Sequence, residues 1–299
     1  MSARDTVTVR VPASTSNCGS GFDTLGLALQ LPGRVTVSRR AAAPGGAGRR
    51  AAGRSMADAA GAAFFARTGL APFAFSAAVD DGVPPGRGLG SSAVVRVGVL
   101  AGLNALAGAG VAPREIIAWA TALEGHPDNA AAAVLGGFCV SRTSPVNGAY
   151  LDNVRIDVPA DLVFVVAAPR IEMRTGESRA ALPRRVPHAD AVRSLNAAAF
   201  LVAVFATGDF AKLRHAVADF LHEPYRLPRI PGAREAIDAG VAAGAYTGWL
   251  SGSGSGVLCV CPRAAAAGVR AAMTAALTRG AAAADSWILT AENNGFAVE

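Results

Sequence analysis

The sequence of 299 residues contains a single lysine, Lys212, although arginine gives the chain a formal net charge of +6. Nucleotide-binding loops of the Walker type place a lysine against the transferred phosphates. No glycine-rich motif of that kind surrounds Lys212. The shortage of lysine therefore excludes a Walker-type nucleotide enzyme.

Long apolar runs, a leader segment and paired cysteines are also missing. The first ten residues carry no apolar stretch typical of a secretory signal. The nearest candidate for a membrane span, 197–206, is shorter than the roughly 18 to 20 residues that a span requires. The four cysteines form no CxxC pair, and Cys259 and Cys261 point to the same face of an expected strand. We expect buried, inert thiols in a cytoplasmic protein that binds no membrane.

Aromatic residues are scarce, at 6% of the chain, whereas hydrophobic residues make up 52%. This apolar content and the modest net charge exclude disorder as the dominant state. A basic chain can indicate nucleic-acid binding, but the arginines here are spread out and no dense basic stripe is interleaved with aromatics. We therefore expect no nucleic-acid partner.

The order of expected elements favours an α+β protein with two domains, 1–158 and 159–299. Strands are expected at 6–11, 33–39, 73–79, 137–141, 162–167, 246–250 and 256–261. Helices are expected at 56–68, 91–106, 114–124, 189–206, 210–220, 231–243 and 263–278. A short helix is expected after the turn at 126–128, and polar turns with a weak strand are expected at 145–159. An alanine-, glycine- and arginine-rich stretch at 40–54 is expected to form a surface loop.

The strongest local signal is a glycine-rich segment that leads into the helix expected at 91–106. Its three glycines let the backbone approach a ligand closely, and the helix adds free N–H groups and a positive dipole end. Ser91 and Ser92 add hydroxyls that can cap the helix, bind a phosphate or ligate magnesium. The pattern also fits an ordinary glycine-rich turn. The predicted nucleotide-binding residues are Pro84, Pro85, Gly86, Arg87, Gly88, Leu89, Gly90, Ser91, Ser92, Ala93 and Val94.

Two further polar, glycine-rich segments, at 12–23 and 250–256, each follow an expected strand. Each of them alone fits a flexible turn. Three such loops with few charges together favour an active site built around an anionic ligand.

These three loops resemble the three motifs of the GHMP kinases, a superfamily named after galactokinase, homoserine kinase, mevalonate kinase and phosphomevalonate kinase. The phosphate loop of that superfamily lacks the Walker lysine, in agreement with the single lysine here. Within the superfamily the chain is most similar to the homoserine kinases, over essentially its whole length. The stretches that carry this similarity are 11–17, 21–26, 124–129, 175–183 and 222–226.

The resemblance implies a two-domain GHMP kinase fold, with a ribosomal-protein-S5-domain-2-like N-terminal domain and a ferredoxin-like C-terminal domain. It also implies ATP and Mg²⁺ as cofactors, L-homoserine as the phosphate acceptor and a homodimer. Ser92 and Glu124 are then the expected magnesium ligands. Glu124 ends the helix expected at 114–124, where its charge opposes the helix dipole, and this misfit favours a functional reason for it.

Homoserine is a zwitterion with a hydroxyl group, so its site needs a carboxylate for the ammonium and an arginine for the carboxylate. By resemblance, Asp23 binds the ammonium, and Arg179 and Arg226 bind the carboxylate. The other residues that the resemblance places at the substrate are Asn17, His126, Asn129, Thr175 and Gly252.

Phosphoryl transfer depends mainly on positioning and on charge neutralisation. Some GHMP kinases use an Asp as base, assisted by a Lys, and this chain resembles the homoserine kinases in having Asn129 at that position. We therefore expect transfer without a strong protein base, with Asn17 and Asn129 aligning the hydroxyl. Asp23 is the rival base and completes the set of predicted catalytic residues.

Three serines depart from the family pattern. Ser20 and Ser255 replace prolines, which is expected to loosen their loops, and Ser55 replaces an Asn often found near the adenine. The sequence leaves two alternatives open: a GHMP kinase acting on threonine or mevalonate, and a GHMP-fold sensor that binds its ligand without transfer. The intact Ser92, Glu124 and phosphate loop argue against a sensor.

Overall fold

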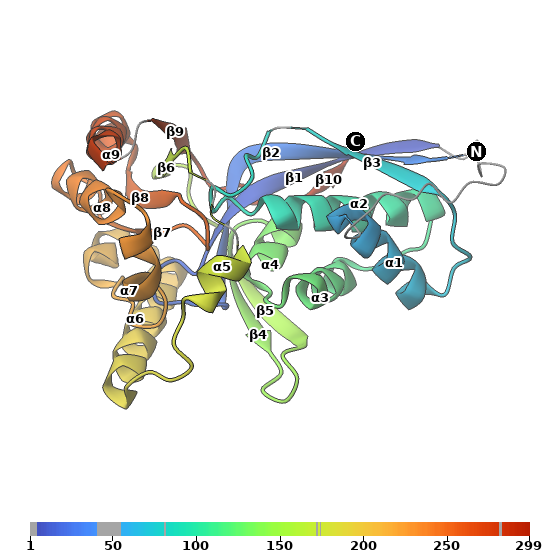
Figure 1. Cartoon of the computed structure of the whole chain (residues 1–299), viewed down its shortest axis with the longest axis horizontal. Helices are drawn as coiled ribbons and strands as arrows, with labels where there is room; N and C mark the ends of the chain where they lie inside the picture. The colour runs from blue at the N-terminus through green and yellow to red at the C-terminus, as the bar shows by residue number, and fades with distance from the viewer. Residues whose placement is uncertain (1–4, 41–54, 81, 172, 174, 281–282) are drawn as a thin grey trace.

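The computed structural model describes residues 5–40, 55–80, 82–171, 173, 175–280 and 283–299. Most of the loop expected at 40–54 lies outside these ranges. Two α+β units lie side by side along the long axis of the molecule (Figure 1). Each unit contains one antiparallel sheet with helices packed against it, so the predicted α+β class is confirmed.

The first sheet has the order β10-β1-β2-β4-β5, and β3 also pairs with β2. Its strands are β1 (Thr6–Ser16), β2 (Leu25–Arg39), β3 (Phe75–Val79), β4 (Phe138–Thr143), β5 (Tyr150–Ile156) and β10 (Ala297–Val298). The helices of this unit are α1 (Met56–Thr68), α2 (Ser91–Ala107), α3 (Pro113–Glu124) and α4 (Asp128–Leu135).

Helix α2 lies directly against β1 and β2 (Figure 1), and two glycines on its contact face, Gly98 and Gly102, allow the close approach. A Cβ atom on Gly98 would overlap Val35, and one on Gly102 would press against Val37. On β1 the alternate residues Val7 and Val9 are buried beneath this helix. The close approach holds the first turn of α2 at the end of β1, where the candidate site lies.

The second sheet has the order β7-β8-β6-β9. Its strands are β6 (Leu162–Pro169), β7 (Thr247–Leu250), β8 (Val257–Pro262) and β9 (Ala284–Leu289). The α-helices are α5 (Thr175–Ala180), α6 (His188–Thr207), α7 (Glu223–Arg226), α8 (Ala233–Ala242) and α9 (Ala266–Gly280). Short 3-10 turns are η1 (Phe210–His215), η2 (Leu227–Arg229) and η3 (Arg263–Ala265).

Strand β6 is buried along its whole length, between β8 and β9. Val163 and Val165 pack into a core with α8 and α9, whereas Phe164 and Val166 face the larger core that both units share. This alternation explains the continuous apolar run that predicted the strand. The packing joins the two units through an apolar interior.

The four cysteines are buried free thiols, as the sequence predicted. Burial raises the pKa of the Cys139 and Cys259 thiols to about 12. Such thiols stay protonated at neutral pH and are poor nucleophiles.

Several element boundaries differ from those expected. Strand β1 continues to Ser16 and β2 begins at Leu25, so the first loop spans only 17–24. The helix expected at 210–220 is wrong, because only η1 forms there. The helices α5 and α7, the strands β9 and β10 and the short turn η2 were not expected.

Helix α6 is 20 residues long, with a mean hydropathy of 1.5 in its most apolar window, and it meets the length and composition needed for a membrane span. The 197–206 run that the sequence showed is thus only part of a longer apolar helix. The helix nevertheless packs on the protein, since Leu201 and Phe205 are buried in the main core. Its outer face leaves Leu195 69% exposed and Val192 49% exposed.

Candidate active site

The three glycine-rich segments meet where the two units join, and backbone hydrogen bonds connect them. The Ser14 amide donates to the Leu89 carbonyl oxygen at 3.1 Å, which ties β1 to the loop before α2. The Gly252 amide donates to the Ser16 carbonyl oxygen at 3.2 Å, which ties the loop after β7 to β1. Segments far apart in the sequence therefore build one wall.

The glycines of the loop before α2 are required by this close approach. Gly88 and Gly90 have left-handed backbone, with φ of +73° and +70°. A Cβ atom on Gly88 would overlap the carbonyl oxygen of Ser251, and one on Gly254 would overlap the Gly88 amide. The two loops thus pack backbone against backbone, with no room for a side chain between them.

The first turn of α2 opens into the cavity beside these loops. Gly90 is the N-cap residue and makes no side-chain capping bond, so the amides of the first turn remain available to a ligand. The cavity is open to solvent on one side and has a volume of about 430 Å³. It is lined by Gly86, Gly88, Leu89, Gly90, Ser91, Ser92, Glu124, His126, Asn129, Met173, Gly252, Ser253 and Gly254. Open amides at a helix N-terminus suit phosphate groups.

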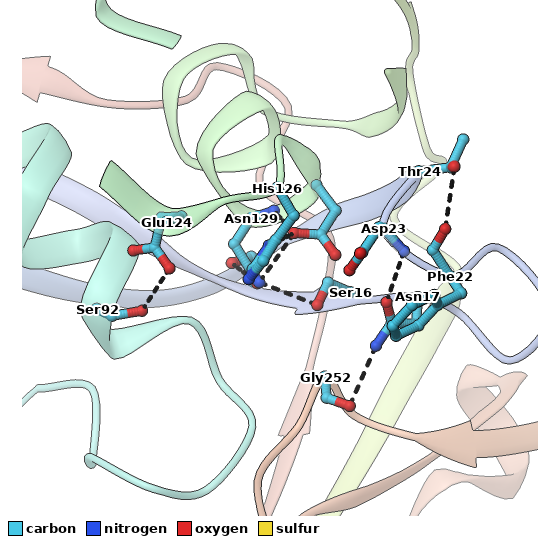
Figure 2. Close-up of polar contacts among 12 residues, drawn as sticks. Ser16, Asn17, Phe22, Asp23, Thr24, Ser92, Glu124, His126, Asn129 and Gly252 are labelled. Carbon is cyan, nitrogen blue, oxygen red and sulfur yellow. Dashed lines mark hydrogen bonds and ion pairs between the residues drawn. The ribbon is translucent and has the colours of Figure 1, made fainter. Parts of the chain in front are cut away.

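Ser92 and Glu124, the predicted metal ligands, lie together on one wall of this cavity (Figure 2). The Ser92 hydroxyl donates to Glu124 Oε2 at 3.1 Å. The other carboxylate oxygen of Glu124 pairs with Arg96, one turn after Ser92 on α2. Arg96 therefore offsets the unfavourable position of Glu124 at the end of α3, and the sequence interpretation missed it.

His126, Asp128 and Asn129 form a buried polar cluster, of which His126 and Asn129 line the cavity. Asp128 Oδ1 lies 2.6 Å from His126 Nδ1 and accepts from the Asn129 amide at 2.6 Å. The Asn129 side chain accepts from Ser14 at 2.8 Å. It donates to Ser16 at 2.9 Å (Figure 2). Asp128, which was not predicted as a site residue, thus fixes both of its predicted neighbours.

The charges within this cluster stabilise each other. Burial by itself would lower the pKa of His126, but the Asp128 carboxylate outweighs it and raises that pKa to about 9. Burial would likewise raise the pKa of Asp128, and the His126 imidazolium holds it below its usual value. One ligand atom from each of these two residues and one from Asp23 lie within 4.8 Å of one another, so the pair borders the next part of the site.

The loop 17–24 holds Asn17 and Asp23 in strained backbone conformations. The φ angles of Asn17, Cys18 and Asp23 are +66°, +46° and +53°, in a region that residues other than glycine rarely adopt. The Asn17 side chain spans the loop: it accepts from the Asp23 amide at 3.0 Å and donates to the Gly252 carbonyl at 3.1 Å (Figure 2). Strain of this kind is typical of functional sites.

Asp23, Arg179 and Arg226 gather around the ring of Phe22. Arg179 makes a two-pronged ion pair with Asp23, with N–O distances of 2.9 and 2.8 Å. Arg226 is 1% exposed and donates to the carbonyl oxygens of Ser178 at 3.3 Å and Gly252 at 3.5 Å. Both guanidinium carbons lie over the Phe22 ring, at 5.4 Å for Arg179 and 5.2 Å for Arg226. This group presents both signs of charge.

Most of the predicted site residues come together, with a few exceptions at the edges. Arg87 points away and donates to the Ile171 carbonyl at 2.7 Å. The Ala93 and Val94 side chains are buried in the core. Thr175 begins α5, and its side chain lies outside the described part of the structure.

Two of the serines that depart from the family pattern, Ser255 and Ser55, make polar contacts in the structure. Ser255 was expected to loosen its loop, and this is wrong: its amide donates to Gly86 at 3.2 Å and its hydroxyl donates to Pro169 at 3.3 Å. A proline could not make either bond. Ser55 is the N-cap of α1 and forms a capping box with Asp58.

Comparison with known proteins gives a consistent result. Residues 54–137 match the model of the GHMP kinases N terminal domain, and residues 200–279 match that of the GHMP kinases C terminal domain. A homoserine kinase from Moorella thermoacetica is 41% identical over 277 residues, which cover 91% of this chain and 92% of that protein. Another from Prochlorococcus marinus is 34% identical over 305 residues, covering 97% of this chain and 94% of that protein.

Solved structures show the same relationship. A homoserine kinase from Cytophaga hutchinsonii superposes with a TM-score of 0.87 and 26% identity, over 100% of this chain and 99% of that chain. A mevalonate kinase from Methanococcus jannaschii superposes with a TM-score of 0.66 and 12% identity, over 96% of this chain and 98% of that chain. The second similarity concerns the fold alone.

Proposed function

Because this chain belongs to the homoserine kinases of the GHMP kinase family, we infer that it transfers the γ-phosphoryl group of ATP to the side-chain hydroxyl of L-homoserine. The product is O-phospho-L-homoserine, an intermediate on the route to threonine. The observation that carries this inference is the layout of one site: an anion cradle at one end, and a carboxylate with two guanidinium groups at the other.

The amino-acid end of the substrate fits the group around Phe22. We propose that Asp23 binds the ammonium and that Arg226 and Arg179 bind the carboxylate. Burial lowers the pKa of Arg226 to about 10, yet the group stays charged at neutral pH. A buried guanidinium that donates to neutral carbonyls gains from a carboxylate partner.

The nucleotide end fits the glycine loops and the start of α2. We propose that the amides near Ser91 and Ser92 bind the phosphates, since no side chain caps this helix N-terminus and the cavity opens beside it. The hard oxygen donors of Ser92 and Glu124 suit Mg²⁺. Bound there, the ion would neutralise charge on the phosphates.

The acceptor hydroxyl is proposed to lie between Asn17 and Asn129. Both amides are held rigidly by the contacts described above, so they can align the hydroxyl without reorganising. Asp23 is the rival base, but both of its oxygens accept hydrogen bonds from Arg179. We propose transfer without a protein base, the proton passing to phosphate or water.

The D23N variant tests this mechanism. If Asp23 only binds the ammonium, D23N raises the KM and Kd for homoserine together and retains a measurable kcat. Loss of kcat with an unchanged homoserine Kd would instead make Asp23 the base.

Other substrates are separated by a direct assay. Mevalonate lacks an ammonium group for Asp23, whereas threonine is a zwitterion like homoserine and matches both charges. ADP release is to be measured with L-homoserine, L-threonine and mevalonate, and we expect the highest kcat/KM with L-homoserine. Absence of turnover with L-homoserine would overturn the proposed function. Binding of ATP and homoserine without any ADP release would support a sensor.

We also propose that the enzyme is a cytoplasmic homodimer that pairs through α6. The exposed side chains of Val192, Leu195 and Phe200 on this helix support the proposal, since charged faces are usual on a solvated helix. Beside them runs an apolar groove of about 1040 Å³ between α6 and the first loop. A second copy of this face would cover both surfaces.

A further inference from the structure

Asp23 and Arg179 carry the two opposite charges that we assign to substrate binding, and they bind each other. The ion pair has the two-pronged form, which uses both oxygens of the Asp23 carboxylate and two nitrogens of Arg179. An ammonium group that binds Asp23 must therefore displace the guanidinium, at least in part. A carboxylate that binds Arg179 must in turn displace Asp23.

The two arginines differ in their freedom to move. Arg226 is buried and held by two carbonyl oxygens, so it is a fixed part of the site. The side chain of Arg179 is 42% exposed and projects from the six-residue helix α5. The Phe22 ring lies beneath the Arg179 guanidinium and still contacts it when the ion pair with Asp23 is broken. The geometry therefore allows the pair to open without sending Arg179 into bulk solvent.

We propose that the Asp23–Arg179 pair is an internal stand-in for a zwitterionic substrate and that binding proceeds by exchange of partners. The substrate ammonium replaces the guanidinium on Asp23, and the substrate carboxylate replaces Asp23 on Arg179. One ion pair becomes two, and the net charge of the site stays the same. The inference rests on the proposed function and deepens it, because it names what selects α-amino acids.

The exchange penalises a ligand that carries only one of the two charges. An amine without a carboxylate would break the pair and leave Arg179 without a new anionic partner. A carboxylate without an amine would leave Asp23 without a new cationic partner. Each of these ligands therefore lacks one contact with the site, and its binding free energy also includes the cost of separating Asp23 from Arg179. A site with independent subsites would penalise only the missing contact.

The first test uses D23N and 4-hydroxybutyrate, which is homoserine without its amino group. Asn tolerates left-handed backbone, so the φ of +53° at this position is preserved. Removal of the Asp23 carboxylate frees Arg179. We therefore expect 4-hydroxybutyrate to bind to D23N about ten-fold more tightly than to the wild type. Homoserine, which loses its ammonium partner, is expected to bind more weakly.

The matched control removes one acidic charge nearby without touching the pair. Glu177 is exposed on the same helix α5, so E177Q changes the local potential but leaves Asp23 and Arg179 together. We expect E177Q to leave the affinity for 4-hydroxybutyrate within about two-fold of the wild type, as screening of exposed charges predicts. Equal gains in D23N and E177Q would overturn the proposal.

The second test keeps the charge and weakens the pair. R179K retains a cation but loses the two-pronged geometry. We expect 3-amino-1-propanol, which carries the ammonium alone, to bind several-fold tighter to R179K while homoserine binds more weakly. An unchanged or weaker affinity for the amine would count against the exchange, because the net charge of the site is the same.

Binding is to be measured by calorimetry with Mg²⁺ and a non-hydrolysable ATP analogue, so that no ligand is turned over. Thermal unfolding of each variant verifies its folding. Turnover of homoserine by the wild type reports separately on the proposed function. If homoserine is phosphorylated and neither analogue gains affinity in its variant, the function stands and the exchange is wrong.

Discussion

Glu223 is a buried carboxyl group next to the site that the proposed mechanism does not use. It is 4% exposed, and Oε1 accepts from the Leu250 amide at 2.7 Å, just before the loop that contacts Asn17. Burial raises its pKa from 4.5 to about 7, while the Leu250 amide and Arg234 oppose that rise and Asp219 adds to it. Glu223 therefore holds the end of β7 through the Leu250 amide, and the free energy needed to ionise this buried carboxyl makes the stability depend on pH.

E223Q is predicted to change how stability depends on pH. The folded protein holds this proton up to about pH 7, whereas the unfolded chain releases it near pH 4.5. Stability from this group is thus lost as the pH rises from about 4.5 to 7, by about 3 kcal/mol at most. In urea unfolding, the free energy of unfolding of E223Q should rise relative to that of the wild type between pH 5 and pH 8. E235Q, at an exposed position on α8, should show no such gain.

Asp128 is predicted to act by positioning Asn129 and His126. D128N removes the charge that both neighbours face, so we expect kcat to fall about ten-fold or more, with a smaller effect on the KM for ATP. Melting temperature should also fall, because His126 loses its counter-ion.

D152N is the matched control for D128N. Asp152 also accepts from the following amide, at 2.9 Å, but it is exposed on β5. D152N should keep the wild-type kcat. A D128N enzyme that kept wild-type kcat would show that Asn129 is held well enough by Ser14 and Ser16 alone.

At the scale of single elements, the glycine loop before α2 depends on space for its backbone. G88A is predicted to raise the KM for ATP about ten-fold or more, because the new Cβ would push the Ser251 carbonyl away. The left-handed backbone adds a cost of roughly 1–2 kcal/mol to stability.

G148A separates these two effects. Gly148 has nearly the same φ, +71°, but nothing lies within 4 Å of its added Cβ. G148A should therefore lose only the stability that the left-handed backbone costs an alanine, and its KM for ATP should equal that of the wild type. The same KM in both variants would mean that the contact between the two loops does not shape the nucleotide site.

The elements show where local sequence patterns suffice and where they fail. The start of α2, the helix ending at Glu124 and the apolar strand β6 follow from the glycine-rich segment before the first, the helical periodicity of the second and the apolar run of the third. The end of β1, residues 12–16, could not be predicted in this way. These mostly polar residues form a strand because they pair with residues 26–32 of β2, which lie further along the chain. Local composition alone predicts a loop there.

The candidate site divides in the same way. Ser92, Glu124 and Asn129 are predicted through motifs, and they do lie together. Arg96 and Asp128 are missed because their role comes from contacts made only after folding. The pairing of Asp23 with Arg179 joins residues 156 positions apart, which no local pattern encodes.

At the scale of the whole molecule, α6 leaves an apolar face outside both cores. L195E is predicted to convert the dimer to monomers, because Leu195 is 69% exposed on the face that we propose to pair. Light scattering after size-exclusion chromatography measures the mass. V146E, at a 90% exposed apolar residue of the first unit, should remain dimeric. A wild-type monomer would rule out this interface.

The last strand also links the ends of the chain. In β10, Ala297 and Val298 pair with Arg10 and Val9 of β1, and the Glu299 amide donates to Thr8 at 2.8 Å. Deletion of residues 297–299 removes these bonds and exposes the edge of β1, so we expect a loss of about 2 kcal/mol in urea unfolding and a tendency to aggregate. Unchanged stability would show that β10 pairs without contributing.

The packing of Gly88 against the loop after β7 has a consequence for how this enzyme responds to mutagenesis. Truncating side chains would leave most of the nucleotide cradle intact, because its contacts are peptide groups. The damaging changes are additions: one methyl group on Gly88, Gly90 or Gly254 meets neighbouring atoms at once. A mutational scan that only removes atoms would therefore rank this wall as tolerant, although these glycines leave no space for added atoms.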